Sequence, residues 1–120
     1  MVKVSQLTPL AAVLSGLASA ASAQIGFCTD VNFGGTCINF PIVSDTCVDF
    51  KGGLTLLYHE VSSVIVPAGF ICELYHDYGC TSSSITLLQG RWKGLFSVPN
   101  GSGSTMNFND LTASFSCSPI

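Results

Sequence analysis

Six cysteines are the residues of this sequence with the clearest chemistry. They are separated by 9, 10, 25, 8 and 37 positions, and no C-x-x-C pair of the kind that binds zinc occurs among them. An even number of cysteines in a short chain predicts three disulfides and no free thiol, provided that the compartment is oxidising. The six residues are Cys28, Cys37, Cys47, Cys72, Cys80 and Cys117.

The two histidines offer a weak basis for catalysis. His59 precedes Glu60 and His76 precedes Asp77. Neighbours in a strand point to opposite faces, so neither pair is expected to form a dyad. The serine run at 82–84 has no G-x-S-x-G context, and two histidines alone lack the further ligands of a metal site. We therefore expect a protein that is not an enzyme.

Arg91, Trp92 and Lys93 place two cations beside the only tryptophan of the chain. Such a group could contact a glycan, a lipid head group or a partner protein. The alternative is that Trp92 packs in the core, as tryptophan frequently does, and that only its charged neighbours are exposed.

Asn100-Gly101-Ser102 is an N-x-S sequon in the segment richest in glycine and serine. In a eukaryotic secretory pathway Asn100 could carry a glycan. Asn-Gly also favours tight turns, so an unmodified hairpin tip is equally open.

The first 23 residues have the layout of a secretory leader. Lys3 is followed by an apolar stretch over 7–17 and by Ala21-Ser22-Ala23, an A-x-A cleavage pattern. The alternative is an ordinary buried helix, but the run has no polar face. We predict cleavage after Ala23, which leaves residues 24–120 as a secreted, extracellular monomer. No later apolar run approaches 18 residues, so no transmembrane segment is expected.

The composition supports one small folded domain. The chain has 120 residues, of which 48% are hydrophobic and 9% charged, which argues against disorder and against a coiled coil. Its formal net charge is −3, so it has no electrostatic footprint for nucleic acid or for an anionic membrane.

Short apolar runs separated by Gly, Asp, Asn and Pro predict strands rather than helices. Their spacing, with turn residues between them, is typical of an all-β sandwich. The expected strands lie at 37–42, 61–66, 71–75, 85–88, 95–98 and 113–117, with a flexible loop tip at 100–104.

The chain also contains two similar halves, about 25–68 and about 71–117. Each opens with a strand and an Asp-containing turn and closes with a Ser-containing strand after a polar loop. The first opening turn runs from Cys28 through Phe33 to Gly35, and the second begins at Tyr75. Neither half could bury its own apolar face, so the two are expected to pack together.

These halves resemble the paired Greek-key motifs of the βγ-crystallin superfamily. Cys28, Phe33 and Gly35 stand where that motif has an aromatic, a second aromatic and a glycine, while Cys80 and Ser82 replace the last two in the second half. The run 108–115, Phe-Asn-Asp-Leu-Thr-Ala-Ser-Phe, best matches the closing pattern of the family. The leader and the extra cysteines make the chain most similar to small secreted microbial members, particularly fungal ones. Gly35 is expected to adopt a positive φ in the folded hairpin.

The resemblance also suggests how the cysteines pair. In the Greek-key arrangement it implies, the first strand lies beside the last strand of the other motif, and strands two and three are juxtaposed. The favoured set is Cys28–Cys117, Cys37–Cys47 and Cys72–Cys80. The main alternative contains Cys28–Cys37 and Cys47–Cys117, among 15 connectivities in all.

Calcium is the one cofactor that the resemblance suggests. Each closing loop of the family supplies an Asn/Asp pair and a hydroxyl to calcium, which prefers six to eight oxygen ligands. Here the first loop has Tyr58-His59 in place of the Asn/Asp pair, and the second has Ala113 in place of the hydroxyl. At most one hybrid site remains, from Asn109, Asp110 and Ser62. The alternative is that the Asn/Asp pair makes only loop-closing hydrogen bonds.

We therefore expect a secreted, non-enzymatic, disulfide-stabilised protein of this fold. Its expected role is extracellular, as an antimicrobial or toxin-like protein or as an effector that contacts a host, with a cell-surface glycan or protein as target. A disulfide-stapled domain suits such a role because it resists proteolysis outside the cell. The alternative is a calcium-binding structural or stress-associated extracellular protein.

Overall fold

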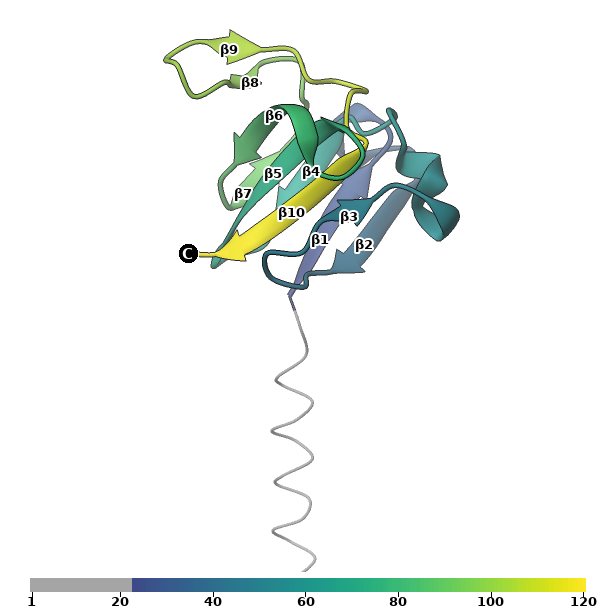
Figure 1. The fold of residues 1–120 in the computed structure, drawn as a ribbon. Helices are drawn as coiled ribbons and strands as arrows, with labels where there is room; N and C mark the ends of the chain where they lie inside the picture. The colour runs from purple at the N-terminus through teal and green to yellow at the C-terminus, as the bar shows by residue number, and fades with distance from the viewer. Residues whose placement is uncertain (1–22) are drawn as a thin grey trace, which may run out of the picture.

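The computed structural model describes residues 23–120 (Figure 1). The predicted leader lies outside these residues except for its last residue, Ala23. Within the described range the regular secondary structure is nearly all strand, with two short 3-10 helices, and turns and loops make up the rest. No helix there is long and apolar enough to cross a membrane.

The described residues contain ten strands and two 3-10 helices. In chain order they are β1 Gln24–Cys28, η1 Val31–Phe33, β2 Cys37–Pro41, β3 Val48–Asp49, η2 Gly52–Leu57, β4 Ser63–Val66, β5 Phe70–Asp77, β6 Thr81–Leu87, β7 Gly90–Trp92, β8 Val98–Pro99, β9 Thr105–Met106 and β10 Ser114–Pro119.

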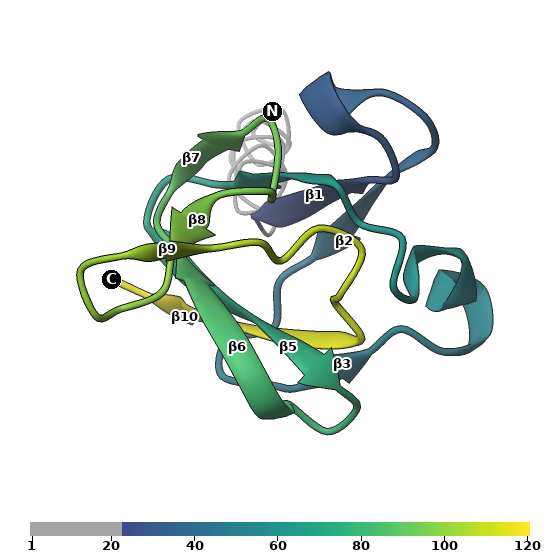
Figure 2. The same cartoon turned by 90° about the horizontal axis from the view of Figure 1, so that it is seen from above.

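Two antiparallel four-stranded sheets form the sandwich, in the orders β2-β1-β4-β7 and β3-β10-β5-β6. Figure 2 shows them as two layers, with β1 and β7 in one and β5, β6 and β3 in the other. Each sheet takes three strands from one half of the chain and its remaining edge strand from the other half. The third strands, β3 and β7, are the ones that cross over. The expected pair of Greek-key motifs in one all-β sandwich is therefore confirmed.

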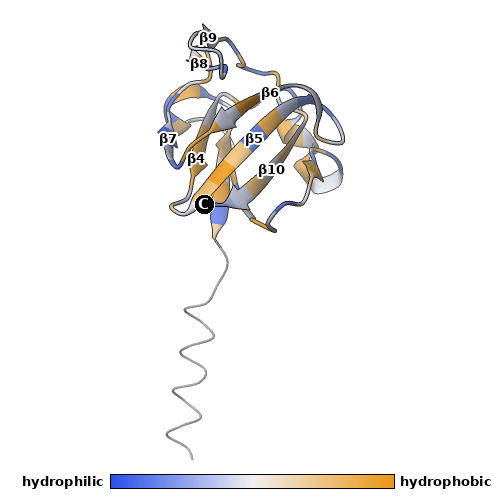
Figure 3. Cartoon of the chain, turned by 60° about the vertical axis from the view of Figure 1, so that its left-hand side comes forward, coloured by the Kyte–Doolittle hydropathy of each residue, from blue (hydrophilic) through white to orange (hydrophobic). Residues whose placement is uncertain are grey.

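The core lies between the two sheets. Phe27 of β1 packs edge-on against Phe50, with ring centroids 5.2 Å apart, and contacts Phe115 of β10 at 4.8 Å. All three side chains are buried. Figure 3 shows hydrophobic residues along β4 and β5. Both strands contribute buried residues to the same core. Because these rings come from both motifs, neither half has a complete core of its own.

Residues 95–98, which we expected to form a strand, are mostly irregular. Leu95 and Val98 are fully buried, but only Val98 lies in a strand, the two-residue β8. These residues are apolar because they close one end of the core, and the backbone N–H of Phe108 donates to Leu95 O at 2.7 Å. The expected loop tip at 100–104 is the turn between β8 and β9.

The structure joins all six cysteines, but in different pairs from those that we favoured. The bonds are Cys28–Cys37, Cys47–Cys80 and Cys72–Cys117. The favoured set is wrong in all three bonds. The alternative is right in Cys28–Cys37 and wrong in Cys47–Cys117.

The first strand of each motif lies beside the last strand of its own motif, which explains the error. Strand β1 pairs with β2 and β4, so Cys28 faces Cys37 directly and their Cα atoms are 4.1 Å apart. Strand β5 pairs with β10, so Cys72 faces Cys117 at 4.0 Å. Each of these two disulfides therefore links two neighbouring strands of the same motif.

The third bond joins the two motifs. Cys47 immediately precedes β3, which crosses into the other sheet and carries it away from Cys37 in β2. There it reaches Cys80, in the turn between β5 and β6, with 5.9 Å between the Cα atoms.

Candidate functional site

One serine in each closing strand holds the opening hairpin of its motif. The Ser63 hydroxyl donates to Asp30 O at 2.6 Å and accepts the backbone N–H of Phe33 at 3.1 Å. In the second motif the Ser114 hydroxyl donates to Asp77 O at 2.6 Å. It accepts the N–H of Cys80 at 2.9 Å. Both serines are fully buried.

The folded shape of both hairpins depends on positive φ angles at matching positions. In the first hairpin they fall at Asn32, Phe33 and Gly35, the last with φ of 72° as expected. The second hairpin repeats them at Gly79, Cys80 and Ser82. Since only glycine adopts this conformation without cost, the three-residue pattern is a specific feature of the turn.

The closing loops of the two motifs contact each other through a pair of backbone hydrogen bonds. The backbone N–H of His59 donates to Thr112 O at 2.9 Å, and that of Asp110 donates to Val61 O at 3.1 Å. The exchange is reciprocal, and His59 and Asp110 both have a positive φ. His59 and Asp110 therefore occupy equivalent positions, one in each loop.

Two of the three predicted calcium ligands, Ser62 and Asp110, come together at this junction. Ser62, from the first motif, donates its hydroxyl to Asp110 Oδ1 of the second at 3.2 Å. The neighbouring Asn109 Oδ1 is buried and has no hydrogen-bond partner in the described chain. We call Ser62, Asn109 and Asp110 the oxygen site. It offers a carboxylate, an amide oxygen and a hydroxyl, which are donors that calcium accepts.

The equivalent position in the other loop is filled by aromatic rings instead. Tyr58 stacks on His59 with 4.0 Å between ring centroids, and His59 lies 5.0 Å from His76. Tyr58 also lies 5.3 Å from Tyr78, whose ring carries Lys51 Nζ 4.4 Å from its centroid. We call the four rings of Tyr58, His59, His76 and Tyr78 the aromatic column. These rings do not supply the carboxylate and amide oxygens that calcium prefers. The described residues contain no group of three or more His, Cys, Asp or Glu side chains placed to hold a metal.

The histidines make contacts that differ from those expected. His59 Nε2 lies 3.0 Å from the backbone oxygen of His76. His76 Nδ1 lies 3.2 Å from Asp77 Oδ1, although neighbours in a regular strand point to opposite faces. The contact forms because the β5–β6 register shifts between Tyr75 and Asp77. Neither ring is bonded to a serine or threonine hydroxyl within residues 23–120, so no nucleophile–base pair is in place there.

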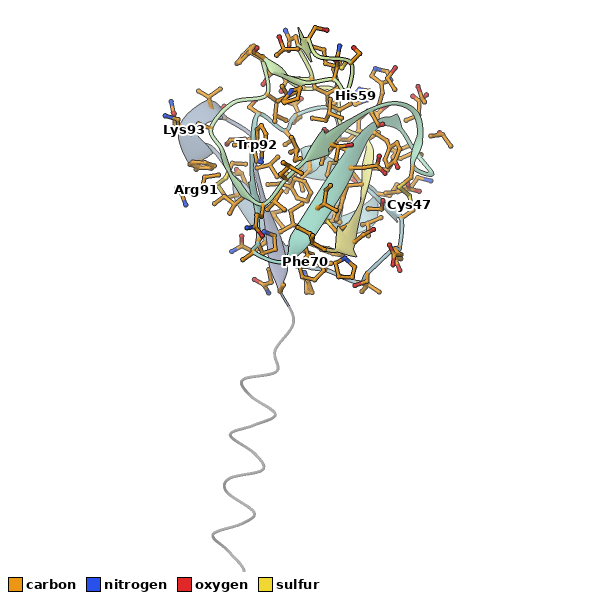
Figure 4. The ribbon with its side chains drawn as sticks, turned by 90° about the vertical axis from the view of Figure 1, so that its left-hand side faces the viewer. Cys47, His59, Phe70, Arg91, Trp92 and Lys93 are labelled. Carbon is orange, nitrogen blue, oxygen red and sulfur yellow. A yellow bond between two sulfur atoms is a disulfide. The ribbon has the colours of Figure 1, made fainter. Side chains whose placement is uncertain are left out.

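The side chains of Arg91, Trp92 and Lys93 are not equally exposed. Arg91 in β7 and Lys93, the residue after β7, are both exposed, whereas Trp92 between them packs against the core. The indole N–H donates to Leu88 O at 2.9 Å. Figure 4 shows the two cations at one rim of the molecule, away from Cys47.

Two exposed apolar residues lie beside these cations. The Arg91 guanidinium carbon lies 4.3 Å from the centroid of the Phe33 ring. Val31 and Phe96 are 39% and 55% exposed. A Cβ atom on the intervening Gly94 would lie within 4 Å of both. We call Val31, Phe33, Arg91, Lys93 and Phe96 the cationic face.

Sequence reasoning missed the members of the cationic face other than the cations. Val31 and Phe33 lie about 60 positions before Arg91, and the hydrogen bond from Asn32 N–H to Lys93 O, 2.7 Å long, joins η1 to the residue after β7. Phe96 was hidden within the expected strand 95–98. An alternating strand would have placed Phe96 on the same face as the buried Val98, so its exposure follows from the irregular backbone of 95–97 and could not be read from the sequence.

Comparison with solved structures places the fold among βγ-crystallin domains. The N-terminal domain of Protein S matches with a TM-score of 0.60 and 19% identity, over 82% of this chain and 98% of that chain. A βγ-crystallin domain from Clostridium beijerinckii matches with a TM-score of 0.60 and 18% identity, over 80% and 98%. A βγ-crystallin from Ciona intestinalis gives a TM-score of 0.55 and 25% identity, over 78% and 98%. No protein-family profile and no curated protein matches the sequence. The resemblance seen in the residues is therefore confirmed in three dimensions.

Proposed function

We propose that this chain, which has the βγ-crystallin fold, is secreted and acts outside the cell by binding a target rather than by catalysis. Its role is that of an antimicrobial or toxin-like protein, or of an effector that contacts a host. The predicted leader and the three disulfides support an oxidising, extracellular environment. The absence of a histidine–hydroxyl pair among residues 23–120 supports a role without a catalytic nucleophile.

The cationic face is the observation that carries the proposal. The sequence after the predicted cleavage site has three cations and seven acids, yet two of those cations lie here, beside two exposed apolar side chains. Arginine and aromatic residues are enriched where protein interfaces gain most of their free energy. We therefore assign the target as a protein on the surface of another cell, with an acidic patch that faces Arg91 and Lys93.

The test is growth inhibition, cell death or cell-surface binding by the purified oxidised protein, compared with two double variants. Lys93→Glu with Phe96→Ser reverses one charge and removes one exposed apolar group on the cationic face. Lys51→Glu with Leu56→Ser makes the matched change on another part of the surface, where Leu56 is 45% exposed. We expect the first variant to lose about tenfold or more in potency and the second to retain it. Equal potency of both variants, or an inactive parent protein, would overturn the proposal.

The oxygen site favours a second candidate function, a calcium-binding extracellular protein. Its support is the buried Asn109 Oδ1, which has no partner among residues 23–120 and belongs to the residue before Asp110, together with the Ser62–Asp110 hydrogen bond. Asn109, Asp110 and Ser62 would hold the ion with nearby backbone carbonyls, and the ion would tie the two closing loops together. One carboxylate supplies little charge, so we place this function second.

Thermal unfolding in EDTA and then in millimolar Ca²⁺, with Mg²⁺ as control, distinguishes the two candidates. Calcium at 100 times its dissociation constant stabilises a folded protein by about 2.7 kcal/mol. A Ca²⁺-specific gain that is lost in Asp110→Ala but kept in Glu60→Gln would establish the second candidate. Glu60 is the matched acid in the other loop, next to His59. An unchanged unfolding temperature would remove calcium from consideration.

A further inference from the structure

The β8–β9 hairpin projects beyond the two sheets and carries the sequon at its tip (Figure 1). Asn100, Gly101 and Ser102 are all exposed. Gly101 and Gly103 both have φ of 86°, which lets the tip fold tightly. A large group attached to Asn100 would therefore meet solvent rather than the core.

Ser102 is positioned to polarise the Asn100 amide. Its hydroxyl donates to Asn100 Oδ1 at 2.8 Å, and its backbone N–H donates to the same oxygen at 3.0 Å. Two donors on the carbonyl oxygen draw electron density from the amide nitrogen and make its protons more acidic. The nitrogen itself donates one proton to Ser104 Oγ at 2.9 Å, which leaves the second proton free.

All hydrogen bonds of this tip are local. They join residues within 100–104, including Asn100 N–H to Ser104 O at 3.1 Å. The turn can therefore form as the chain emerges into a secretory compartment, before the two motifs have packed together.

A hollow of about 300 Å³ lies directly beside Asn100, between the hairpin and β6. Asn100 and Gly101 form one side of it, and Leu88, which is 57% exposed, forms part of the other. Strand β6 is also the free edge of its sheet. Exposed edges and apolar side chains promote association between copies, and natural proteins cover them.

We infer that Asn100 is an N-glycosylation site and that its glycan covers this hollow and the free edge of β6. In the reaction Asn100 Nδ2 forms a bond to the anomeric carbon of an oligosaccharide. The bond from that carbon to the diphosphate of a lipid carrier breaks, the amide loses one proton to a base of the transferase, and the lipid diphosphate leaves as an anion. The sugar is therefore attached at the rim of the hollow.

The test is the intact mass of the complete precursor secreted from a eukaryotic host, before and after peptide-N-glycosidase treatment. We expect one N-glycan, since the chain has a single sequon. Asn100→Gln and Ser102→Ala should lose the added mass, whereas Ser102→Thr should keep it. Ser104→Ala is the matched control, because it removes a neighbouring hydroxyl and leaves the sequon intact. Secreted protein of unmodified mass would overturn the inference.

A second arm separates this inference from the leader prediction. Residues 24–120 behind a foreign secretory leader should also receive one glycan, and an unmodified product there overturns the site even if the native leader fails. The covering role is tested by binding of a hydrophobic dye. Asn100→Gln should bind more dye than the glycosylated protein, and adding Leu88→Ser should remove the excess. Equal dye binding by the glycosylated and unglycosylated forms would overturn the covering role.

Discussion

Ser63 and Ser114 make the same pair of hydrogen bonds in the two motifs, although they lie in different sheets. Each donates to the carbonyl of an aspartate at 2.6 Å and accepts the N–H three residues further along the hairpin. The two halves therefore share these hydrogen bonds as well as a sequence pattern. A buried hydroxyl in the closing strand fixes the opening hairpin.

Removing either hydroxyl should destabilise the protein. Ser63→Ala and Ser114→Ala each remove a buried hydroxyl together with its two part-buried hydrogen bonds, which costs about 1–3 kcal/mol. Chemical denaturation of the oxidised protein measures the change. Ser83→Ala, on the exposed part of β6, is the control and should change the free energy of unfolding by less than about 0.5 kcal/mol. Equal stability of all three variants would contradict this role of the serines.

Gly35 should be intolerant of a side chain. Its φ is 72°, and an added Cβ would lie 2.9 Å from Asp30 Oδ2. Gly35→Ala therefore combines a strained backbone with a close contact, and we expect a loss of more than about 1 kcal/mol. Gly53→Ala is the control, because Gly53 has no positive φ and no atom within 4 Å of an added Cβ. The measurement is thermal unfolding, and a loss no larger than that of Gly53→Ala would contradict the prediction.

Tyr75 should ionise late in the folded protein. Burial raises the pKa of its hydroxyl, and the hydrogen bond to Glu73 Oε1, 2.8 Å long, together with the charge of Glu73, raises that pKa further. Since the folded pKa lies above the unfolded one, the stability from this group is complete below pH of about 10. It is lost as the pH rises through the folded pKa.

Absorbance of tyrosinate during an alkaline titration measures this shift. The native protein should show a component that appears at higher pH than in the unfolded chain, and Tyr75→Phe should remove it. Glu73→Gln keeps the burial and removes the charge, so the late component should move to lower pH. A native titration that overlays the unfolded one would count against the shift.

The longer strands could be predicted from the sequence, but the crossing strands could not. Residues 37–42 alternate over enough positions to show a strand, and 37–41 form β2. Strand β3 has only two residues and β7 only three, so neither carries a readable period. These two short strands cross between the sheets, and the crossing of β3 brings Cys47 to Cys80.

The members of the oxygen site could be predicted from the closing-loop pattern, whereas those of the aromatic column could not. Asn109, Asp110 and Ser62 were identified because a repeated motif assigns each of them a place. The column joins Tyr58 to Tyr78, and nothing in their separate surroundings relates them. The column forms because His59 stands at the position in the first loop that is equivalent to Asp110 in the second, so that aromatic rings lie there instead of a carboxylate.

The opening hairpin of the second motif is joined to the first motif by a disulfide. The opening hairpin of the first motif instead contacts a cation of the second motif. Val48 pairs with Phe115, one residue after Ser114, and Trp92 pairs with Val64, one residue after Ser63. The residues that precede them, Cys47 and Arg91, are therefore equivalent. Cys47 is bonded to Cys80, and Arg91 covers the ring of Phe33, the counterpart of Cys80.

This asymmetry predicts very different costs for two matched variants. Replacing Cys47 and Cys80 together by serine opens a loop of 33 residues, for which the loss of chain-entropy stabilisation is about 4 kcal/mol. Arg91→Ala removes an exposed cation–π contact worth about 0.5–1 kcal/mol. Denaturant unfolding should therefore separate the two variants by several kcal/mol. Hydrogen exchange should increase most in the β5–β6 turn of the cysteine variant and in η1 of the arginine variant. Similar losses in both, or exchange that rises uniformly, would show that the bond between Cys47 and Cys80 does not anchor the second hairpin.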